Sequence, residues 1–286
     1  MSKIKSLFIV LLAYFIAIGS GYAVILYQDI NPLYEILIAD IIATVVIYLF
    51  SYYFKNSSIY DPYWSVIPPF LLLYWIMISE YNLFTSMLLL FSVLFWSIRL
   101  TFNWVRSWPG MHHEDWRYVD MRKASGKYFE ISNFLGIHLF PTLIVFTCCI
   151  PFKYAIVSPI NMFVILGFLI CLIGVLYEII SDQQLYNFKL KNSGIIETGL
   201  WKYSRHPNYY GEILFWFGLF FYGCNYNNMF YLLINPLLML LMFVYVSIPW
   251  IENKILRTRP NYSEYQKRVS VLFPEISLLK QFFSKK

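Results

Sequence analysis

Three polar side chains lie at helical spacing around the start of an apolar segment in the second half of the chain. Arg205, Asn208 and Glu212 are three and four residues apart, so they line one helical face. An ionised group inside a membrane-length apolar helix costs roughly 2.5–3.5 kcal/mol, so Glu212 needs a partner or a task. Pro207 suits a first helical turn, whose free N–H groups attract anions. This pattern indicates an anion-binding site; the alternative is an ordinary interfacial turn with Arg205 on lipid headgroups.

Two carboxylates precede this turn at the end of another apolar segment. Glu178 and Asp182 are four residues apart and share a helical face, where they repel each other unless donors bridge them. Lys189 or Arg205 is that bridge in the simplest structural interpretation. Alternatively, the two carboxylates accept hydrogen bonds from hydroxyl or amide groups of a bound cofactor.

The polar segment 107–129 carries a third group of reactive side chains. They are Trp108, His112, His113, Glu114, Asp115, Trp116, Arg117, Tyr118 and Asp120. Membrane di-iron enzymes use several histidine boxes, whereas this chain has only four histidines. A mononuclear site from His112, Glu114 and Asp115 stays open, although neighbours in sequence rarely converge on one ion. A solvated interfacial loop is a second interpretation. We favour an anion- and substrate-binding lid, without a metal.

The composition predicts the kind of structure that positions these polar side chains. The chain is 59% hydrophobic and 13% charged, whereas soluble domains have about 45–50% apolar and about 25% charged residues. Segments of bilayer length predict helices near 6–26, 31–54, 65–79, 82–106, 130–152, 157–181, 208–223 and 228–251, the third and seventh being short. We therefore expect an all-α polytopic integral membrane helical bundle with about 7–8 transmembrane helices. The intramembrane charges Asp40 and Arg99 should face its interior, although Arg99 lies near enough to a helix end to snorkel.

The positions of the basic residues orient this bundle. With eight spans, all of the 22 lysines and arginines except Lys153 fall on the side of the N-terminus. The positive-inside rule then makes both termini cytoplasmic. The first apolar segment resembles a secretory signal, but it is long enough to span and is interpreted as a retained anchor. We expect a multi-pass membrane protein, of the endoplasmic reticulum if eukaryotic or of the inner membrane if bacterial.

Several segments resemble one family of membrane proteins. They are RHPNYYGE (205–212), YDPYWS (60–65), RLTFNWVRSWPGMHHEDWRY (99–118), SDQQLYNF (181–188) and RPNYSEYQKRVSVLFP (259–274). The first resembles the C-terminal signature of the steroid 5α-reductase superfamily, and together they are most similar to its DUF1295 branch. The RHPNY core is less specific, since sterol reductases and isoprenylcysteine carboxyl methyltransferases share versions of it. On this resemblance we divide the chain into N-terminal membrane helices with substrate-side loops (1–130) and a cofactor-binding region with a cytoplasmic tail (131–286).

The resemblance implies a cofactor, NADPH. Asp182 matches the aspartate of the family's cofactor site, Asn208 and Glu212 match its Asn-x-x-x-Glu, and Lys189 falls where the family can place an arginine. The implied cofactor-binding residues are Asp182, Lys189, Arg205, His206, Asn208, Tyr209, Glu212, Tyr262 and Tyr265. The resemblance also implies that the two tail tyrosines cover the adenosine end of NADPH together with the basic residues Lys254, Arg257 and Arg259. Since no GxGxxG follows a strand-like run and no GxxxxGK[ST] occurs, the dinucleotide would sit within the helical bundle.

The implied activity is reduction of a carbon–carbon double bond in a lipid or sterol-like substrate that enters from the bilayer. A proton donor is then needed, and our candidates are Tyr118 and Tyr63, tuned by Asp115 or Asp61. Steroid 5α-reductases also hold a substrate ketone with a glutamate and a tyrosine. Trp96 stands near the place of that tyrosine, so a 3-keto steroid is not implied.

Two other functions compete with this one. One is an S-adenosylmethionine-dependent membrane methyltransferase of the isoprenylcysteine carboxyl methyltransferase type, which shares RHPxYxG and a terminal Glu…Tyr-x-x-Tyr pattern. The other is a non-catalytic lipid-binding protein on the same scaffold. Charge separates the two cofactors, because adenosylmethionine is a cation without phosphates, whereas the basic residues around the motif favour NADPH. Nucleic-acid binding has no support, since the aromatic residues lie in membrane spans.

Overall fold

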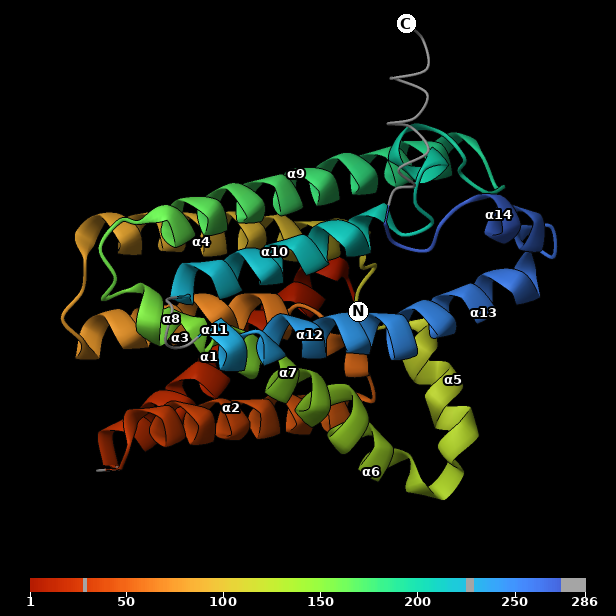
Figure 1. Ribbon diagram of the computed structural model, residues 1–286. Coiled ribbons are helices and arrows are strands. Elements are labelled where there is room, and N and C mark those ends of the chain that lie inside the picture. The colour runs from red at the N-terminus through yellow and green to blue at the C-terminus, as the bar shows by residue number, and fades with distance from the viewer. Residues whose placement is uncertain (28–29, 225–228, 274–286) are drawn as a thin grey trace, which may run out of the picture. The chain divides into compact units, whose positions relative to one another are not determined.

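The structure is a computed structural model that describes residues 1–27, 30–224 and 229–273. Over these residues it is helical and contains no strand (Figure 1), which confirms the predicted all-α class. The chain forms two compact units, Met1–Pro159 and Ile160–Lys286. The division after residue 130 came from the family resemblance rather than from packing, and it stays a prediction.

Six helical segments are long and apolar enough to cross a bilayer. They are Lys3–Tyr27, Pro32–Phe54, Leu83–Ser107, Trp116–Ala155, Met162–Lys191 and Phe230–Thr258. The two helices expected to be short are α3 (Tyr63–Ile78), with 16 residues, and α10 (Pro207–Gly223), with 17. At 1.5 Å per residue they are about 24–26 Å long, less than the roughly 30 Å of a hydrocarbon core. These helices fit a multi-pass membrane protein, whereas the number of crossings and the side of the termini stay predictions.

In the first unit, helices that follow each other in the sequence pack against each other. Its larger helices are α1 (Lys3–Tyr27), α2 (Pro32–Phe54), α3, α4 (Leu83–Ser107) and α7 (Phe140–Cys149). α1 packs along α2, α3 packs on α4, and α7 contacts both α2 and α3 (Figure 1). The Tyr14 hydroxyl of α1 donates to the carbonyl of Ile59 (2.8 Å) in the turn η1 (Ser57–Ile59). This bond ties the first helix to the segment that carries Tyr60 and Asp61.

The segment 107–129 is not the loop that we predicted. It contains α5 (Trp116–Ser125) and η2 (Gly126–Tyr128). After it come α6 (Phe129–Ser132), the π-helical turn η3 (Asn133–Leu139), α7 and α8 (Pro151–Ala155). The Asp115 side chain starts α5 by accepting a hydrogen bond from the backbone N–H of Arg117 (2.9 Å). A carboxylate at this N-cap position satisfies one of the free N–H groups of the first turn, so the polar residues after it form a helix.

The second unit is dominated by the pair α9 (Met162–Lys191) and α10. The predicted end of α9 at residue 181 is wrong, because ten further residues without Gly or Pro continue the helix to Lys191. α11 (Met229–Leu232), α12 (Ile234–Met242), the π-helical turn η5 (Phe243–Ser247), α13 (Ile248–Thr258) and α14 (Tyr262–Arg268) follow α10. The predicted end of the last span at 251 is seven residues too early, since α13 runs to Thr258.

Glycines let α9 and α10 approach each other closely. A Cβ atom on Gly174 would lie 2.6 Å from the carbonyl oxygen of Gly211, and one on Gly218 would lie 2.7 Å from the backbone nitrogen of Cys171. Small residues at such crossings allow backbone contact between apolar helices. The close crossing brings the polar end of α9 beside the start of α10.

Candidate functional site

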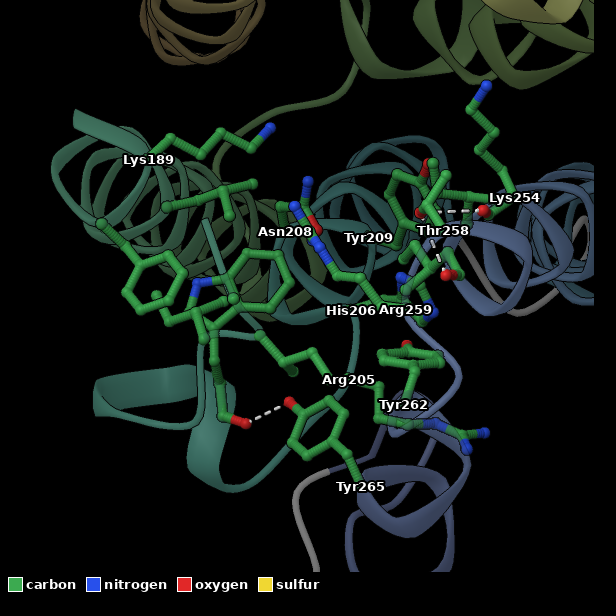
Figure 2. A pocket seen from close by; sticks show the side chains of 18 residues that line it. Lys189, Arg205, His206, Asn208, Tyr209, Lys254, Thr258, Arg259, Tyr262 and Tyr265 are labelled. Carbon is green, nitrogen blue, oxygen red and sulfur yellow. Dashed lines mark hydrogen bonds between the residues drawn. The ribbon is translucent and has the colours of Figure 1, made fainter. Parts of the chain in front are cut away.

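A cavity of about 380 Å³ lies in the second unit, at the start of α10. The end of α9, the turn η4 (Gly199–Lys202), α13, α14 and the connecting segments between them supply the rest of its wall (Figure 2). Seven of the nine predicted cofactor-binding residues line it: Lys189, Arg205, His206, Asn208, Tyr209, Tyr262 and Tyr265. The volume lies within the range of about 300–1,000 Å³ that is usual for small-molecule sites.

The cavity is lined by positive charge. Lys189, Arg205, Lys254 and Arg259 lie in its wall, and among the described residues that line it none is acidic. Lys189 and Arg259 are close enough to repel each other electrostatically. Clustered lysine and arginine side chains in a wall without acidic side chains favour phosphate or another anion.

Glu252 of α13 holds the turn in front of α10. Its Oε1 accepts a hydrogen bond from His206 Nε2 (3.0 Å) and lies 3.1 Å from Arg205 Nε in an ion pair. Tyr262 also donates to Oε1 (3.2 Å), while Gln266 Nε2 donates to Oε2 (2.8 Å). One buried carboxylate therefore orients Arg205, His206 and Tyr262, all three of which line the cavity.

Our sequence analysis did not assign Glu252 to the site. Two signals could have indicated it. Glu252 is the only acidic residue between Glu212 and Glu264, and it stands at the end of an apolar segment directly before Lys254, Arg257 and Arg259. A carboxylate in that position needs a partner, and the basic turn at Arg205 offers one.

Tyr262 and Tyr265 of α14 close one side of the cavity, and α14 and the segment after it are hydrogen-bonded to the chain in front of α10. The Tyr265 hydroxyl donates to the carbonyl of Trp201, and the backbone N–H of Arg205 donates to the carbonyl of Ser270 (2.9 Å). Burial raises the pKa of both Tyr262 and Tyr265, so both hydroxyls stay neutral donors at physiological pH. Residues 274–286 lie outside the described residues.

Asn208 offers a hydrogen-bond acceptor at the base of the cavity. Its Nδ2 donates to Asp182 Oδ1 (3.3 Å), which orients the amide. Its Oδ1 is buried and has no hydrogen-bond partner among the described residues. An unsatisfied buried acceptor costs about 1–3 kcal/mol, so an N–H or O–H donor of a bound ligand would stabilise this site.

Glu212 and Asp182 are not among the residues that line the cavity. Asp182 reaches it through Asn208. Glu212 is buried and accepts a hydrogen bond from Trp216 Nε1 (2.9 Å), one turn further along α10. The buried carboxylate thus has the partner that its position demanded, and its direct contact with a cofactor stays a prediction.

All four predicted catalytic residues lie in the first unit, and three of them, Tyr118, Asp61 and Asp115, form one cluster. Tyr118 donates to Asp61 Oδ1, and Arg117 pairs with both Asp61 (3.5 Å) and Asp115 (2.8 Å). Burial raises the pKa of Asp61 to about 6, although Arg117 opposes this shift. Tyr63 has a different partner, since its hydroxyl donates to Asp40 Oδ1 (2.9 Å). Asp40 is 2% exposed and faces the interior of the unit, as predicted.

Glu114 and Asp115 of the predicted lid bind the turn η1. Glu114 accepts from the backbone N–H of Ser57 (2.9 Å) and pairs with Arg122 (3.0 Å). The backbone N–H of Asp115 donates to Ser58 Oγ (2.8 Å). In the part of the chain that the structure describes, no group of three or more His, Cys, Asp and Glu side chains is arranged to hold a metal ion.

Comparison with known proteins agrees with the motifs. The model of a family described as "Protein of unknown function (DUF1295)" matches residues 47–269. The chain belongs to the DUF1295 family. A similar protein is "Uncharacterized protein C594.04c" of Schizosaccharomyces pombe, which is 23% identical over 87% of this chain and 82% of its own length. No solved structure matches. Membership of this DUF1295 protein in the wider steroid 5α-reductase superfamily stays a prediction.

Proposed function

We propose that this DUF1295 protein is an oxidoreductase that uses NADPH to reduce a carbon–carbon double bond of a lipid or sterol-like substrate in the membrane. The observation that carries the proposal is the cavity at the start of α10, whose wall contains four cationic side chains and no acidic one. Seven residues implied by the family resemblance line that cavity.

The residues present fit a phosphorylated nucleotide. Lys189 and Arg259 would hold phosphate oxygens, because charge-assisted bonds to phosphate are short and strong. Tyr262 and Tyr265 offer aromatic faces and neutral hydroxyl donors for a base or ribose. The unsatisfied Oδ1 of Asn208 accepts a hydrogen bond from an amide or hydroxyl group. When bound, NADPH supplies the hydride.

The same charges argue against adenosylmethionine. That cofactor carries a sulfonium cation and no phosphate, so a wall with Lys189, Arg205, Lys254 and Arg259 repels it. Glu252, outside the cavity wall, offsets part of the charge of Arg205, and none of the described residues that line the cavity is an acid. The methyltransferase is therefore the weaker candidate.

The test is equilibrium binding of NADPH and of S-adenosylmethionine to the full-length protein purified in detergent. We expect NADPH to bind, and Arg259→Gln to weaken it roughly ten- to a hundredfold, since a hydrogen bond to a charged group contributes about 1.5–3 kcal/mol. Arg257 was also expected over the adenosine end, but it is exposed in the last turn of α13, just before the C-cap Arg259, and does not line the cavity. Arg257→Gln is therefore the matched control. Binding of adenosylmethionine alone would favour methylation, and binding of neither would favour the lipid-binding scaffold.

Reduction itself is tested by oxidation of bound NADPH on addition of fractionated membrane lipids. Tyr118 and Tyr63 remain the predicted proton donors. If either serves, replacing it by Phe lowers the rate of NADPH oxidation while the dissociation constant of NADPH stays within twofold. Unchanged rates in both variants would remove the two tyrosines from the mechanism.

A further inference from the structure

A carboxyl group lies inside the apolar helix α2 of the first unit. Asp40 is 2% exposed; its Oδ1 accepts from Tyr63, and its Oδ2 is buried without a hydrogen-bond partner among the described residues. No lysine, arginine or histidine of the described part of the chain pairs with it. Ionisable groups at such depth are costly and mark ion paths or proton relays.

Buried hydroxyl groups connect Asp40 to the turn that follows α2. Tyr63, which donates to Asp40, also interacts with the Thr44 side chain. Thr44 Oγ1 lies 3.1 Å from Thr142 Oγ1, and Thr142 Oγ1 lies 2.9 Å from the Tyr60 hydroxyl. All four side chains are at most 3% exposed. The Thr142 hydroxyl donates to the carbonyl of His138 (2.8 Å) in this structure, so it must rotate to pass its proton on to Thr44. Each hydroxyl can donate and accept, so after that rotation neighbouring groups can exchange protons. We call Tyr63, Thr44, Thr142 and Tyr60 the hydroxyl chain.

A second set of polar groups continues toward the same end of α2. The His138 ring packs 4.9 Å from the Tyr60 ring, and His138 Nε2 lies 3.0 Å from Ser51 Oγ. Asp40, Thr44 and Ser51 lie on α2 in that order, so the polar groups follow the helix for about 16 Å at 1.5 Å per residue. They end near η1, where Asp61 is partly exposed to solvent.

We propose that the hydroxyl chain is a proton path that exchanges the proton of Asp40 with water at the loop end of α2. In one transfer Tyr60 gives its proton to Thr142, Thr142 gives its own to Thr44, Thr44 gives its own to Tyr63, and Tyr63 protonates Asp40. Tyr60 then regains a proton from solvent, so no hydroxyl is left charged. Other ionisable groups beside this path are Tyr14, His138, Cys149 and Asp61. They belong to the same unit.

The path would serve the proposed reductase, because reduction of a double bond takes up one proton for each hydride. That use rests on the proposed function, whereas proton exchange at Asp40 does not. The experiment therefore needs neither nucleotide nor substrate. NADPH binding and proton exchange at Asp40 are therefore measured separately, and either can fail without the other.

The test is infrared spectroscopy of the full-length protein in detergent while H2O is replaced by D2O. We expect a carboxylic-acid C=O band that Asp40→Asn removes and that shifts on deuteration. Thr142→Val, which keeps the shape but removes the bridging hydroxyl, should slow that shift at least tenfold. Tyr60→Phe should also slow it, and Thr142→Ser should restore the wild-type rate.

Thr147→Val is the matched control. Thr147 lies on α7 like Thr142, but its hydroxyl donates only to the carbonyl of Ile144 (2.7 Å), so its loss should leave the exchange rate unchanged. Two results would overturn the proposal. One is the lack of any acid band that depends on Asp40. The other is equal exchange in wild type, Thr142→Val and Tyr60→Phe.

Discussion

Glu252 and His206 share a hydrogen bond of 3.0 Å, although 46 positions separate them in the chain. Through this contact the end of an apolar helix fixes the turn that starts α10. Because Arg205 and Tyr262 bind the same carboxylate oxygen, the orientation of three cavity residues depends on one acid that does not itself line the cavity.

Replacing Glu252 by Ala should destabilise the protein by about 3–5 kcal/mol, because Arg205 is left buried without its partner. The measurement is thermal or denaturant unfolding of the purified protein in detergent. Glu264→Ala is the control, since Glu264 is exposed in the first turn of α14; its effect should stay within about 0.5 kcal/mol. Equal unfolding midpoints for the two variants would show that Glu252 does not organise the turn.

Lys189→Gln should weaken NADPH binding roughly tenfold and reduce its dependence on salt, because one cation is removed from the cavity wall. Lys191→Gln makes the same charge change two residues later on α9, outside the cavity. Titrations at two ionic strengths measure both effects. A similar loss in the two variants would mean that general surface charge, not the cavity, attracts the nucleotide.

The contribution of Asp61 to the stability of the protein should rise as the pH falls from 7 to 5. Its pKa is about 6 in the folded protein against 3.8 for an unperturbed carboxyl, so the folded form binds the extra proton. The contribution of Asp61 is complete below about pH 4 and is lost as the pH rises through about 6. Between pH 7 and pH 5 it amounts to about 1 kcal/mol, or about 2–4 °C in melting temperature.

Asp61→Asn isolates this contribution, because an amide does not titrate. Melting temperatures of wild type and variant at pH 5 and pH 7 give the difference that belongs to Asp61. The pH-dependent change should be smaller in the variant by those few degrees. An identical pH dependence in both proteins would show that the carboxyl is not held in its protonated form.

Gly174→Ala should destabilise the second unit by about 1–3 kcal/mol, because the added Cβ would lie 2.6 Å from the carbonyl oxygen of Gly211. The helices α9 and α10 would have to separate, which also moves Asp182 away from Asn208. Gly19→Ala is the control: a Cβ on Gly19 of α1 meets no atom within 4 Å, and alanine favours a helix. Unfolding midpoints compare the two, and a neutral Gly174→Ala would contradict the close crossing.

The positions of the helices could be predicted from the sequence because they follow from local properties. Bilayer-length apolar segments and proline positions indicated both short helices, α3 and α10, and six long ones are present. Local composition failed where polar residues continue a helix, as after residue 181 in α9 and at residues 116–125 in α5. Polarity marks the end of an apolar stretch, not the end of hydrogen bonding along the backbone.

The candidate site, like the fold, could be predicted only in part from the sequence. The motif around Arg205 and Asn208 supplied four of the cavity residues, Arg205, His206, Asn208 and Tyr209, since neighbours on one turn stay together in any tertiary fold. Only the structure showed that Glu252 binds His206 and that Tyr63 donates to Asp40 rather than to Asp61. Those pairs join residues 46 and 23 positions apart. The packing of whole helices decides which of several available partners a buried carboxylate meets, and no local pattern contains that information.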